Sequence, residues 1–208
     1  MERKEKEYTH VSILVVGGGP AGLAAAIAAK SANKDIDIVV LEKGEAAGNH
    51  NLSGAVLETA SLKRLLDESG FDWQAIKGAD TLLERGVKDD DVLFLFGKQL
   101  SVNISPLITI GRKLGLSFGQ MCNEGNSIVS ISRLTKLLGE IAVSLGVEVY
   151  TGFGAKEILY DTDRKKVNGI KLVDQGLDKE GNPQPNYVKG ETITADVVIL
   201  AEGTDGLI

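Results

Sequence analysis

Residues 11–43, with the sequence VSILVVGGGPAGLAAAIAAKSANKDIDIVVLEK, decide the fold of this chain. The stretch begins with an apolar run rich in β-branched residues, 11–16, which predicts a short strand. The glycine-rich run 17–22 follows without a spacer, and an alanine-rich segment that predicts a helix comes next. A second apolar run, 36–41, predicts another strand. The stretch is therefore expected to form a parallel strand–turn–helix–strand unit.

The glycine-rich run has the pattern of a phosphate-binding turn. A first glycine permits the tight turn, a second lets the backbone approach a pyrophosphate, and a third lets helix and strand pack closely. Proline suits the first helical turn because its missing N–H would be unbonded there. The free N–H groups and the positive dipole end of the helix face the phosphates. We therefore assign to dinucleotide binding Gly17, Gly19, Pro20, Ala21 and Gly22.

Glu42 follows Gly22 by twenty residues, at the tip of the second predicted strand. Its carboxylate can accept hydrogen bonds from adenosine ribose hydroxyls there, which also disfavours a 2′-phosphate. A glycine-rich turn in an ordinary α/β domain is the simpler alternative. We give this alternative little weight, because the predicted strand, helix and second strand and the acidic residue Glu42 follow one another at the spacing of the dinucleotide-binding motif. The residues thus predict a dinucleotide-binding fold.

The composition limits the classes of protein to which the chain can belong. The 208 residues allow one good-sized domain, or one and part of another. A formal net charge of -6 argues against a nucleic-acid partner. The single cysteine, Cys122, excludes an intramolecular disulfide and any cysteine-ligated iron–sulfur cluster built from this chain alone. Residues 1–7 are charged and lack the apolar core of a signal peptide, so we expect a cytoplasmic, reducing setting.

The middle of the chain divides into a polar loop, a helix and an apolar region. The loop 43–55 contains His50, to which we assign no role because no second catalytic group is visible. Residues 57–69 have the spacing of an amphipathic helix that ends at Gly70. Residues 92–96 and 100–104 flank a predicted two-residue hairpin turn, and the first of these strands is expected to be buried on both faces or to face something apolar.

Residues 106–121 continue the apolar region, with only Arg112 and Lys113 as charges. One interpretation is core packing beneath a lid, which the residues alone slightly favour. The other is a surface that dips into a membrane or faces quinone, with the two cations near lipid headgroups.

Residues 130–146 predict a second helix, with Ser130 as its N-cap and Gly146 at its end. Arg133 lies in the first turn, where a cation opposes the local dipole, so an anionic partner is expected. A surface carboxylate and a cofactor phosphate both fit. Residues 147–151 predict a further parallel strand.

The rest of the chain predicts an antiparallel meander followed by a last buried strand. Short strands are expected at 157–160, 169–173 and 187–194, with loops at 161–166 and 181–185. The strand 195–200 comes next, and a sharp turn with Gly203 follows it. The glycines of that turn allow close approach to a ligand.

These motifs resemble those of the electron-transfer-flavoprotein:ubiquinone oxidoreductases, within the glutathione-reductase-like FAD superfamily. The resemblance runs from about Ile13 to the end of the chain. The general signals are the glycine turn, the Glu42-Lys43 pair, Arg133 and the turn 201–203. Three segments are more specific, namely 52–55 (LSGA), 146–150 (GVEVY) and 179–183 (KEGNP).

The resemblance implies an α/β fold, a Rossmann-like FAD-binding domain with a parallel sheet, an antiparallel β-meander crossover and an inserted, partial β-rich region. The FAD-binding parts would be 1–75 and 127–208, and the inserted quinone-side region would be 76–126. FAD would be the cofactor, held also by Lys43, Arg133 and Gly203, with Ser53 and Gly54 near the isoalloxazine. Electron-transfer flavoprotein and ubiquinone would be the partners, and residues 92–118 would contact the inner face of a membrane peripherally. We assign no catalytic residue and no metal ligand.

The family is far longer than this chain, so the resemblance also implies a fragment, a split subunit or a reduced relative. Three alternatives stay open. One is an FAD enzyme that reduces isoprenoid double bonds, as geranylgeranyl reductases do. Another is a non-catalytic FAD-binding piece that needs a partner chain. An NAD-dependent dehydrogenase ranks last because no hydride-transfer site follows the fingerprint.

Overall fold

A six-stranded mixed sheet forms the centre of the protein, in the order β7-β2-β1-β12-β9-β8. The computed structural model describes residues 9–52, 54–76, 78–116, 121, 123–204 and 206. Strand β1 pairs in parallel with both β2 and β12, and β2 pairs in parallel with β7. Strands β9 and β8 continue the sheet in antiparallel fashion. The strands are β1 (Thr9–Val16), β2 (Ile38–Glu42), β7 (Glu148–Thr151), β8 (Ala155–Tyr160), β9 (Val167–Leu172) and β12 (Thr192–Leu200).

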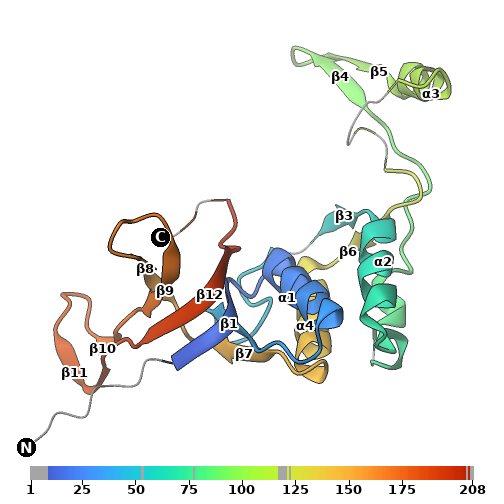
Figure 1. Ribbon diagram of the computed structural model, residues 1–208. Helices are drawn as coiled ribbons and strands as arrows, with labels where there is room; N and C mark the ends of the chain where they lie inside the picture. The colour runs from blue at the N-terminus through green and yellow to red at the C-terminus, as the bar shows by residue number, and fades with distance from the viewer. Residues whose placement is uncertain are drawn as a thin grey trace, which may run out of the picture.

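Two helices, α1 (Pro20–Ala32) and α4 (Ile131–Ser144), cover one face of the parallel strands (Figure 1). Helix α2 (Thr59–Ser69) packs on α1, on the side away from the sheet. Leu23 and Ile27 of α1 are fully buried in one cluster with Val15, Val40 and Ile141. On the opposite face, Leu14 and Leu41 pack with Ile170 of β9. Alternate strand residues therefore fill two separate cores, as the period-two geometry of a strand requires. The predicted Rossmann-like α/β class is confirmed.

The predicted ends at Gly70 and Gly146 and the predicted cap at Ser130 are confirmed, but the predicted start of a helix at residue 57 is wrong, because Leu57 ends the strand β3 (Ala55–Leu57) and α2 begins at Thr59. Helix α1 has Pro20 at its start, as expected, and its C-cap is Asn33, in an extended conformation with φ -142°. Gly70 ends α2 with φ +67°. The Ser130 hydroxyl accepts a hydrogen bond from the Arg133 N–H at 3.4 Å and so caps α4. Glycine and a short polar side chain satisfy helix ends in this way.

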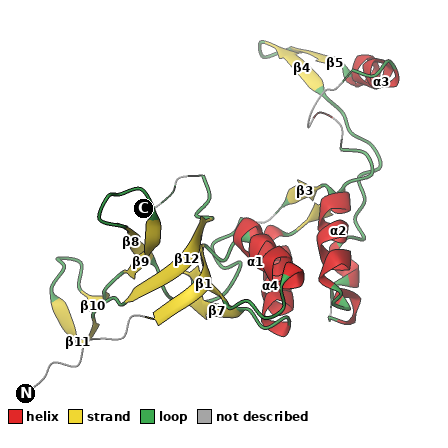
Figure 2. Cartoon of the chain, in the orientation of Figure 1, coloured by secondary structure: helices red, strands yellow, loops and turns green. Residues whose placement is uncertain are grey.

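An arm made of one hairpin and one helix stands away from the sheet (Figures 1 and 2). It comprises β4 (Leu93–Phe96), β5 (Leu100–Asn103) and α3 (Ser105–Lys113). Two corrections follow. All four residues of β4 are exposed, so burial on both faces is wrong, and Phe96 pairs with Leu100, so the turn has three residues. The interpretation of 106–121 as core packing is also wrong for Leu107, Ile110 and Leu114, which are 57–75% exposed.

A short antiparallel pair, β3 (Ala55–Leu57) with β6 (Ser127–Val129), joins the arm to the body and was not predicted from the sequence. Two single 3₁₀ turns, Trp73–Ala75 and Asp80–Leu82, follow α2. In the connection to the arm, the Val87 N–H donates to the Asn126 carbonyl at 2.8 Å. Asp90 accepts hydrogen bonds from both the backbone and the side chain of Asn123.

The meander differs in detail from its prediction. Strands β10 (Gln175–Leu177) and β11 (Pro183–Val188) form a separate two-stranded sheet. The predicted strand at 187–194 is wrong, because β11 ends at Val188 and β12 begins at Thr192. The predicted loop 181–185 is wrong from Pro183 onward. Proline is tolerated there because β11 is an edge strand, which leaves N–H positions unpaired.

The domain boundaries at 75 and 126 stay predictions. No helix within the described residues is long and apolar enough to cross a membrane.

Candidate functional site

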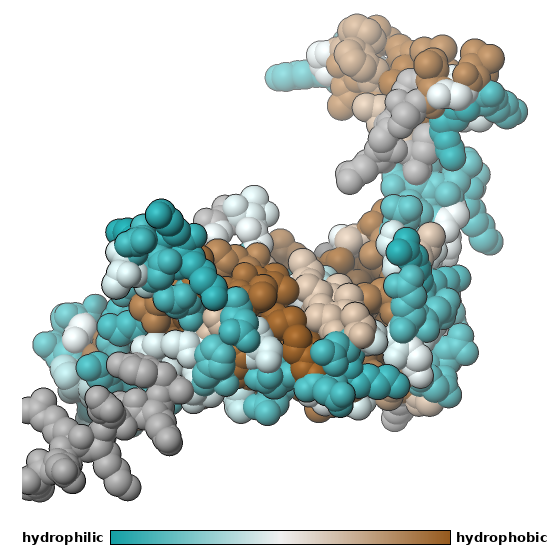
Figure 3. All heavy atoms as spheres, viewed as in Figure 1, coloured by the Kyte–Doolittle hydropathy of each residue, from teal (hydrophilic) through white to brown (hydrophobic). Residues whose placement is uncertain are grey.

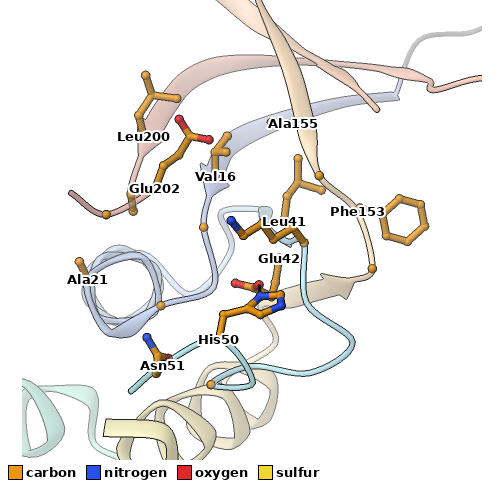
Figure 4. A pocket seen from close by; sticks show the side chains of 18 of the residues that line it. Val16, Ala21, Leu41, Glu42, His50, Asn51, Phe153, Ala155, Leu200 and Glu202 are labelled. Atoms are coloured by element: carbon orange, nitrogen blue, oxygen red, sulfur yellow. Dashed lines mark ion pairs between the residues drawn. The ribbon is translucent and has the colours of Figure 1, made fainter. Parts of the chain in front are cut away.

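A cavity of about 780 Å³ opens at the carboxyl ends of the parallel strands (Figure 4). Its size lies in the range of small-molecule and cofactor sites. The ends of β1, β2 and β12, the start of α1 and the connection from β7 to β8 all contribute to it. Open α/β sheets bind ligands at this edge. Its wall includes Val16, Gly17, Leu41, Gly154, Ala201 and Gly203.

Two glycines of the turn hold backbone segments together. Gly17 has φ +107°, and a β-carbon there would lie 2.3 Å from the carbonyl oxygen of Ala201. The Ala201 N–H in turn donates to the Val16 carbonyl at 2.7 Å. At Gly22 a β-carbon would lie 2.0 Å from the Gly17 carbonyl oxygen. Neither position has room for a side chain, so the ends of β1, α1 and β12 meet closely.

Gly19 differs from these two because it faces open space. It is the N-cap of α1, and a β-carbon there would meet no atom within 4 Å. The helix N-terminus behind it presents unbonded N–H groups toward the cavity. A pyrophosphate can therefore approach this backbone directly.

Glu42 is held by two backbone N–H groups. Gly18 donates to its Oε2 at 2.9 Å, and Gly44 donates to its Oε1 at 2.7 Å. The Glu42 side chain is 12% exposed. A carboxylate oxygen has two lone pairs, so each oxygen keeps one acceptor direction for a ribose hydroxyl.

The cavity brings together seven of the eleven residues assigned to cofactor binding, namely Gly17, Gly19, Pro20, Ala21, Glu42, Lys43 and Gly203. Gly22 does not line the cavity but packs directly against the Gly17 carbonyl of the turn. Gly54, with φ +90°, is not among the described residues that line the cavity, and Ser53 lies outside the described residues. Their contact with a cofactor stays a prediction.

Arg133 lies elsewhere. Its guanidinium donates to the Thr81 hydroxyl at 3.0 Å. It lines a separate cavity of about 150 Å³ with Leu82 and Lys136. The structure therefore does not place it beside the other predicted residues, and its contact with a cofactor phosphate stays a prediction.

Several lining residues had no role in the sequence analysis. His50 and Asn51 enter the cavity from the loop after β2, and Phe153 lies at the β7–β8 connection. The His50 Nδ1 atom is 3.7 Å from Glu42 Oε1. Phe153 packs edge-to-face on Tyr150, with ring centroids 6.2 Å apart. The Tyr150 hydroxyl bonds to Glu148, which raises the pKa of Tyr150. The available signal in the sequence was position: His50 and Asn51 lie in the loop after the second predicted strand, and Phe153 lies just after the strand predicted at 147–151.

The fold and the site define a class of protein. The sequence profile of the family described as pyridine nucleotide-disulphide oxidoreductase matches residues 11–206, and the chain belongs to that family. It is an FAD-binding domain of the FAD-dependent oxidoreductases. The open backbone at Gly19 and the remaining acceptor directions on Glu42 fit this cofactor.

The chain is similar to one particular group of these enzymes. It is 38% identical over 210 residues to the mitochondrial electron transfer flavoprotein-ubiquinone oxidoreductase of Dictyostelium discoideum, covering 99% of this chain and 31% of that protein. It is 37% identical over 209 residues to the enzyme of the same name from Pseudomonas aeruginosa, covering 98% and 35%. The chain thus spans about a third of the length of these relatives.

Solved structures share the fold at lower identity. A geranylgeranyl bacteriochlorophyll reductase-like protein from Thermoplasma acidophilum matches 97% of this chain and 44% of its own, with a TM-score of 0.58 and 19% identity. A flavoprotein/dehydrogenase from Cytophaga hutchinsonii matches 93% and 39%, with a TM-score of 0.54 and 22% identity. At these identities the likeness shows the fold alone.

Proposed function

We propose that the chain is the flavin module of an oxidoreductase that accepts electrons from a reduced electron-transfer flavoprotein and passes them toward ubiquinone. The observation that carries this proposal is the 37–38% identity over nearly the whole chain to relatives of that name. The likeness to geranylgeranyl reductase-like structures is lower in identity and extends only to the fold.

The residues of the cavity would bind and orient the cofactor in this function. The turn at Gly19 and the N-terminus of α1 would hold the pyrophosphate, and Glu42 would bind the adenosine ribose. Lys43 would add a positive charge at the same edge, and Gly203 would let the backbone after β12 approach the flavin end. Bound FAD supplies reversible electron carriage. Such transfer depends on cofactor position more than on acid–base side chains.

The arm supports a peripheral contact with the inner face of a membrane. Leu107, Ile110 and Leu114 recur at helical spacing on and just after α3, and all three are exposed. Leu95 of β4 is 68% exposed. Figure 3 shows hydrophobic residues gathered on this part of the surface. Arg112 and Lys113 at the end of α3 would lie near lipid headgroups.

Two experiments test the function. The purified chain is denatured, and any released nucleotide is identified by absorption spectrum and mass; FAD is expected, and NAD would overturn the proposal. The FAD-loaded chain is then mixed with a reduced electron-transfer flavoprotein. Loss of the oxidised-flavin absorption, as electrons pass to the bound FAD, is the expected result. Reduction of prenyl double bonds instead would establish the isoprenoid alternative, and flavin uptake only with an added partner chain would establish the binding-piece alternative.

A further inference from the structure

Gln175 lines the cofactor cavity and has no role in the proposed function. It is the first residue of β10 and pairs with Val188 of β11. The next residue, Gly176, has φ +71°, and a β-carbon there would lie 2.6 Å from the Asn186 carbonyl oxygen. The backbone at this point is therefore held closely against β11, and the Gln175 side chain leaves it at one defined place in the cavity wall.

The Gln175 side chain is bonded to the connection between β7 and β8. Its Nε2 atom donates a hydrogen bond to the Gly152 carbonyl oxygen at 3.1 Å. A carbonyl oxygen can only accept, so this bond fixes which end of the amide is nitrogen and which is oxygen. Within the described residues it is the only hydrogen bond of this side chain. One N–H donor and the Oε1 acceptor therefore remain unused, side by side on the amide.

The same connection is bonded to the end of β2, which carries the ribose-binding carboxylate. The Phe153 N–H donates to the Glu42 carbonyl oxygen at 2.9 Å, and the Gly152 N–H donates to the Gly44 carbonyl oxygen at 2.8 Å. Gly152 thus accepts from the Gln175 side chain through its carbonyl and donates to the segment after Glu42 through its N–H. Gln175 is therefore held near the ribose-binding end of the cavity.

The covalent structure of FAD decides which part of the cofactor reaches this end. The ribose carries the adenine on its C1′ atom and the pyrophosphate on its C5′ atom, so the two groups leave the sugar in different directions. Gly19 at the start of α1 is assigned to the pyrophosphate. Figure 4 shows Ala21 of α1 on one side of Glu42 and Ala155 of β8 on the other. With its ribose at Glu42, the cofactor extends its adenine toward the β7–β8 connection and Gln175.

The unused groups of the Gln175 amide match one edge of adenine. Adenine presents a donor, its N6 amine, beside an acceptor, its N7 atom, and a glutamine amide binds this pair with two hydrogen bonds. We propose that Gln175 recognises the adenine of FAD: Oε1 accepts from the N6 amine, the second N–H of Nε2 donates to N7, and the bond to Gly152 holds the amide in this orientation. The proposal rests on FAD as the ligand, as the proposed function does, and is independent of the electron donor and acceptor.

The test compares FAD with its deaminated analogue, flavin hypoxanthine dinucleotide, in which a carbonyl oxygen replaces the N6 amine. Two acceptors, this oxygen and Gln175 Oε1, would then face each other. The chain is freed of flavin and titrated with each cofactor. We expect the wild type to bind the analogue with a Kd about ten-fold higher than its Kd for FAD, which is the discrimination that one such pair of hydrogen bonds gives.

Gln175→Leu should bind FAD more weakly and lose this preference, so that its two Kd values differ by about two-fold or less. A purely structural role of Gln175 would instead weaken both cofactors equally and keep the ten-fold ratio. The matched control is Gln184→Leu, because Gln184 is an exposed glutamine of β11 and is not among the described residues that line the cavity. It should keep the wild-type ratio.

Equal affinity of the wild type for the two cofactors, or the same ratio in the wild type and Gln175→Leu, would overturn the role of Gln175 and leave the flavin function standing. A normal ratio in a chain whose bound FAD is not reduced by electron-transfer flavoprotein would overturn the proposed function and leave the adenine contact intact. A wild-type chain that binds neither cofactor would overturn both.

Discussion

The carbonyl oxygen of Ala201 occupies the space in which a side chain at Gly17 would begin, 2.3 Å from the ideal β-carbon position. Residues 184 positions apart in the sequence thus form one wall of the cofactor cavity. The contact ties the glycine turn after β1 to the turn after β12. The stability of the domain and its ability to bind a dinucleotide are therefore coupled at this point.

Gly17→Ala should destabilise the chain and abolish FAD binding together. The positive φ and the overlap with Ala201 each contribute, for a combined loss of about 2–4 kcal/mol in the free energy of unfolding. Urea unfolding measures this loss. Gly86→Ala is the control, because a β-carbon there meets only the Asn126 carbonyl at 4.0 Å. A Gly17→Ala protein of wild-type stability would contradict the described contact.

Gly19→Val should separate binding from stability. Its β-carbon would meet no atom within 4 Å, so we expect a change in unfolding free energy of less than about 1 kcal/mol. The side chain would nevertheless project into the space assigned to the pyrophosphate, and FAD affinity should fall at least about ten-fold, equivalent to 1.4 kcal/mol. Flavin fluorescence titration measures the affinity. Unchanged FAD binding would place the pyrophosphate elsewhere.

Glu42→Gln should weaken FAD binding by about ten-fold and lower stability by about 1 kcal/mol. A glutamine side chain has only one acceptor oxygen, so it cannot satisfy the N–H groups of both Gly18 and Gly44. The amide also presents a donor to a ribose hydroxyl. Calorimetric titration and thermal unfolding measure the two effects. Wild-type affinity for FAD in this variant would contradict the assignment of Glu42 to the cofactor site.

Asp174 should make the stability of the meander depend on pH. It accepts hydrogen bonds from the Gly190 N–H at 2.8 Å and from Lys156 Nζ at 3.0 Å. The bond from Gly190 and then that from Lys156 hold the pKa of its carboxyl below its usual range. A lowered folded-state pKa stabilises the protein above the unfolded-state value, about pH 4, and the effect is lost as the pH falls through the folded-state value.

Asp174→Asn should therefore be less stable than the wild type at pH 7, and the two should converge below pH 4. Thermal unfolding between pH 7 and pH 3 measures this difference. Asp163→Asn serves as the control, since Asp163 lies 3.8 Å from Lys165 with both side chains largely exposed. A constant gap between wild type and Asp174→Asn over the whole range would contradict the argument.

Replacing Leu107, Ile110 and Leu114 together by serine should abolish binding to lipid vesicles and leave FAD binding unchanged. These side chains are exposed on the arm, and burial in lipid would favour each by about 1.5–3 kcal/mol. Co-sedimentation with phosphatidylcholine vesicles measures the binding. Val188→Ser on β11, also an exposed apolar residue, is the control. Equal sedimentation of the triple variant and the wild type would exclude the arm as the contact.

Local sequence determined the unit from β1 to β2, the start of α1, the end of α2, both ends of α4 and the place of Glu42. In each case the signal lies within a few residues, as a glycine turn, a cap or a repeat of apolar side chains. These features depend on backbone conformation and neighbouring contacts, which a short stretch of sequence specifies.

Only the tertiary structure decided where distant segments meet. Strand β12 pairs with β1, for example Ile193 with Thr9, and lies between β1 and β9, which brings Gly203 to the cavity. Arg133 instead donates a hydrogen bond to Thr81, away from that cavity. The apolar residues of β4 are exposed although their pattern is that of a buried strand. A run of hydrophobic residues indicates that these side chains favour apolar surroundings. Which residues surround them depends on contacts between distant parts of the chain, and the sequence of the run does not specify those contacts.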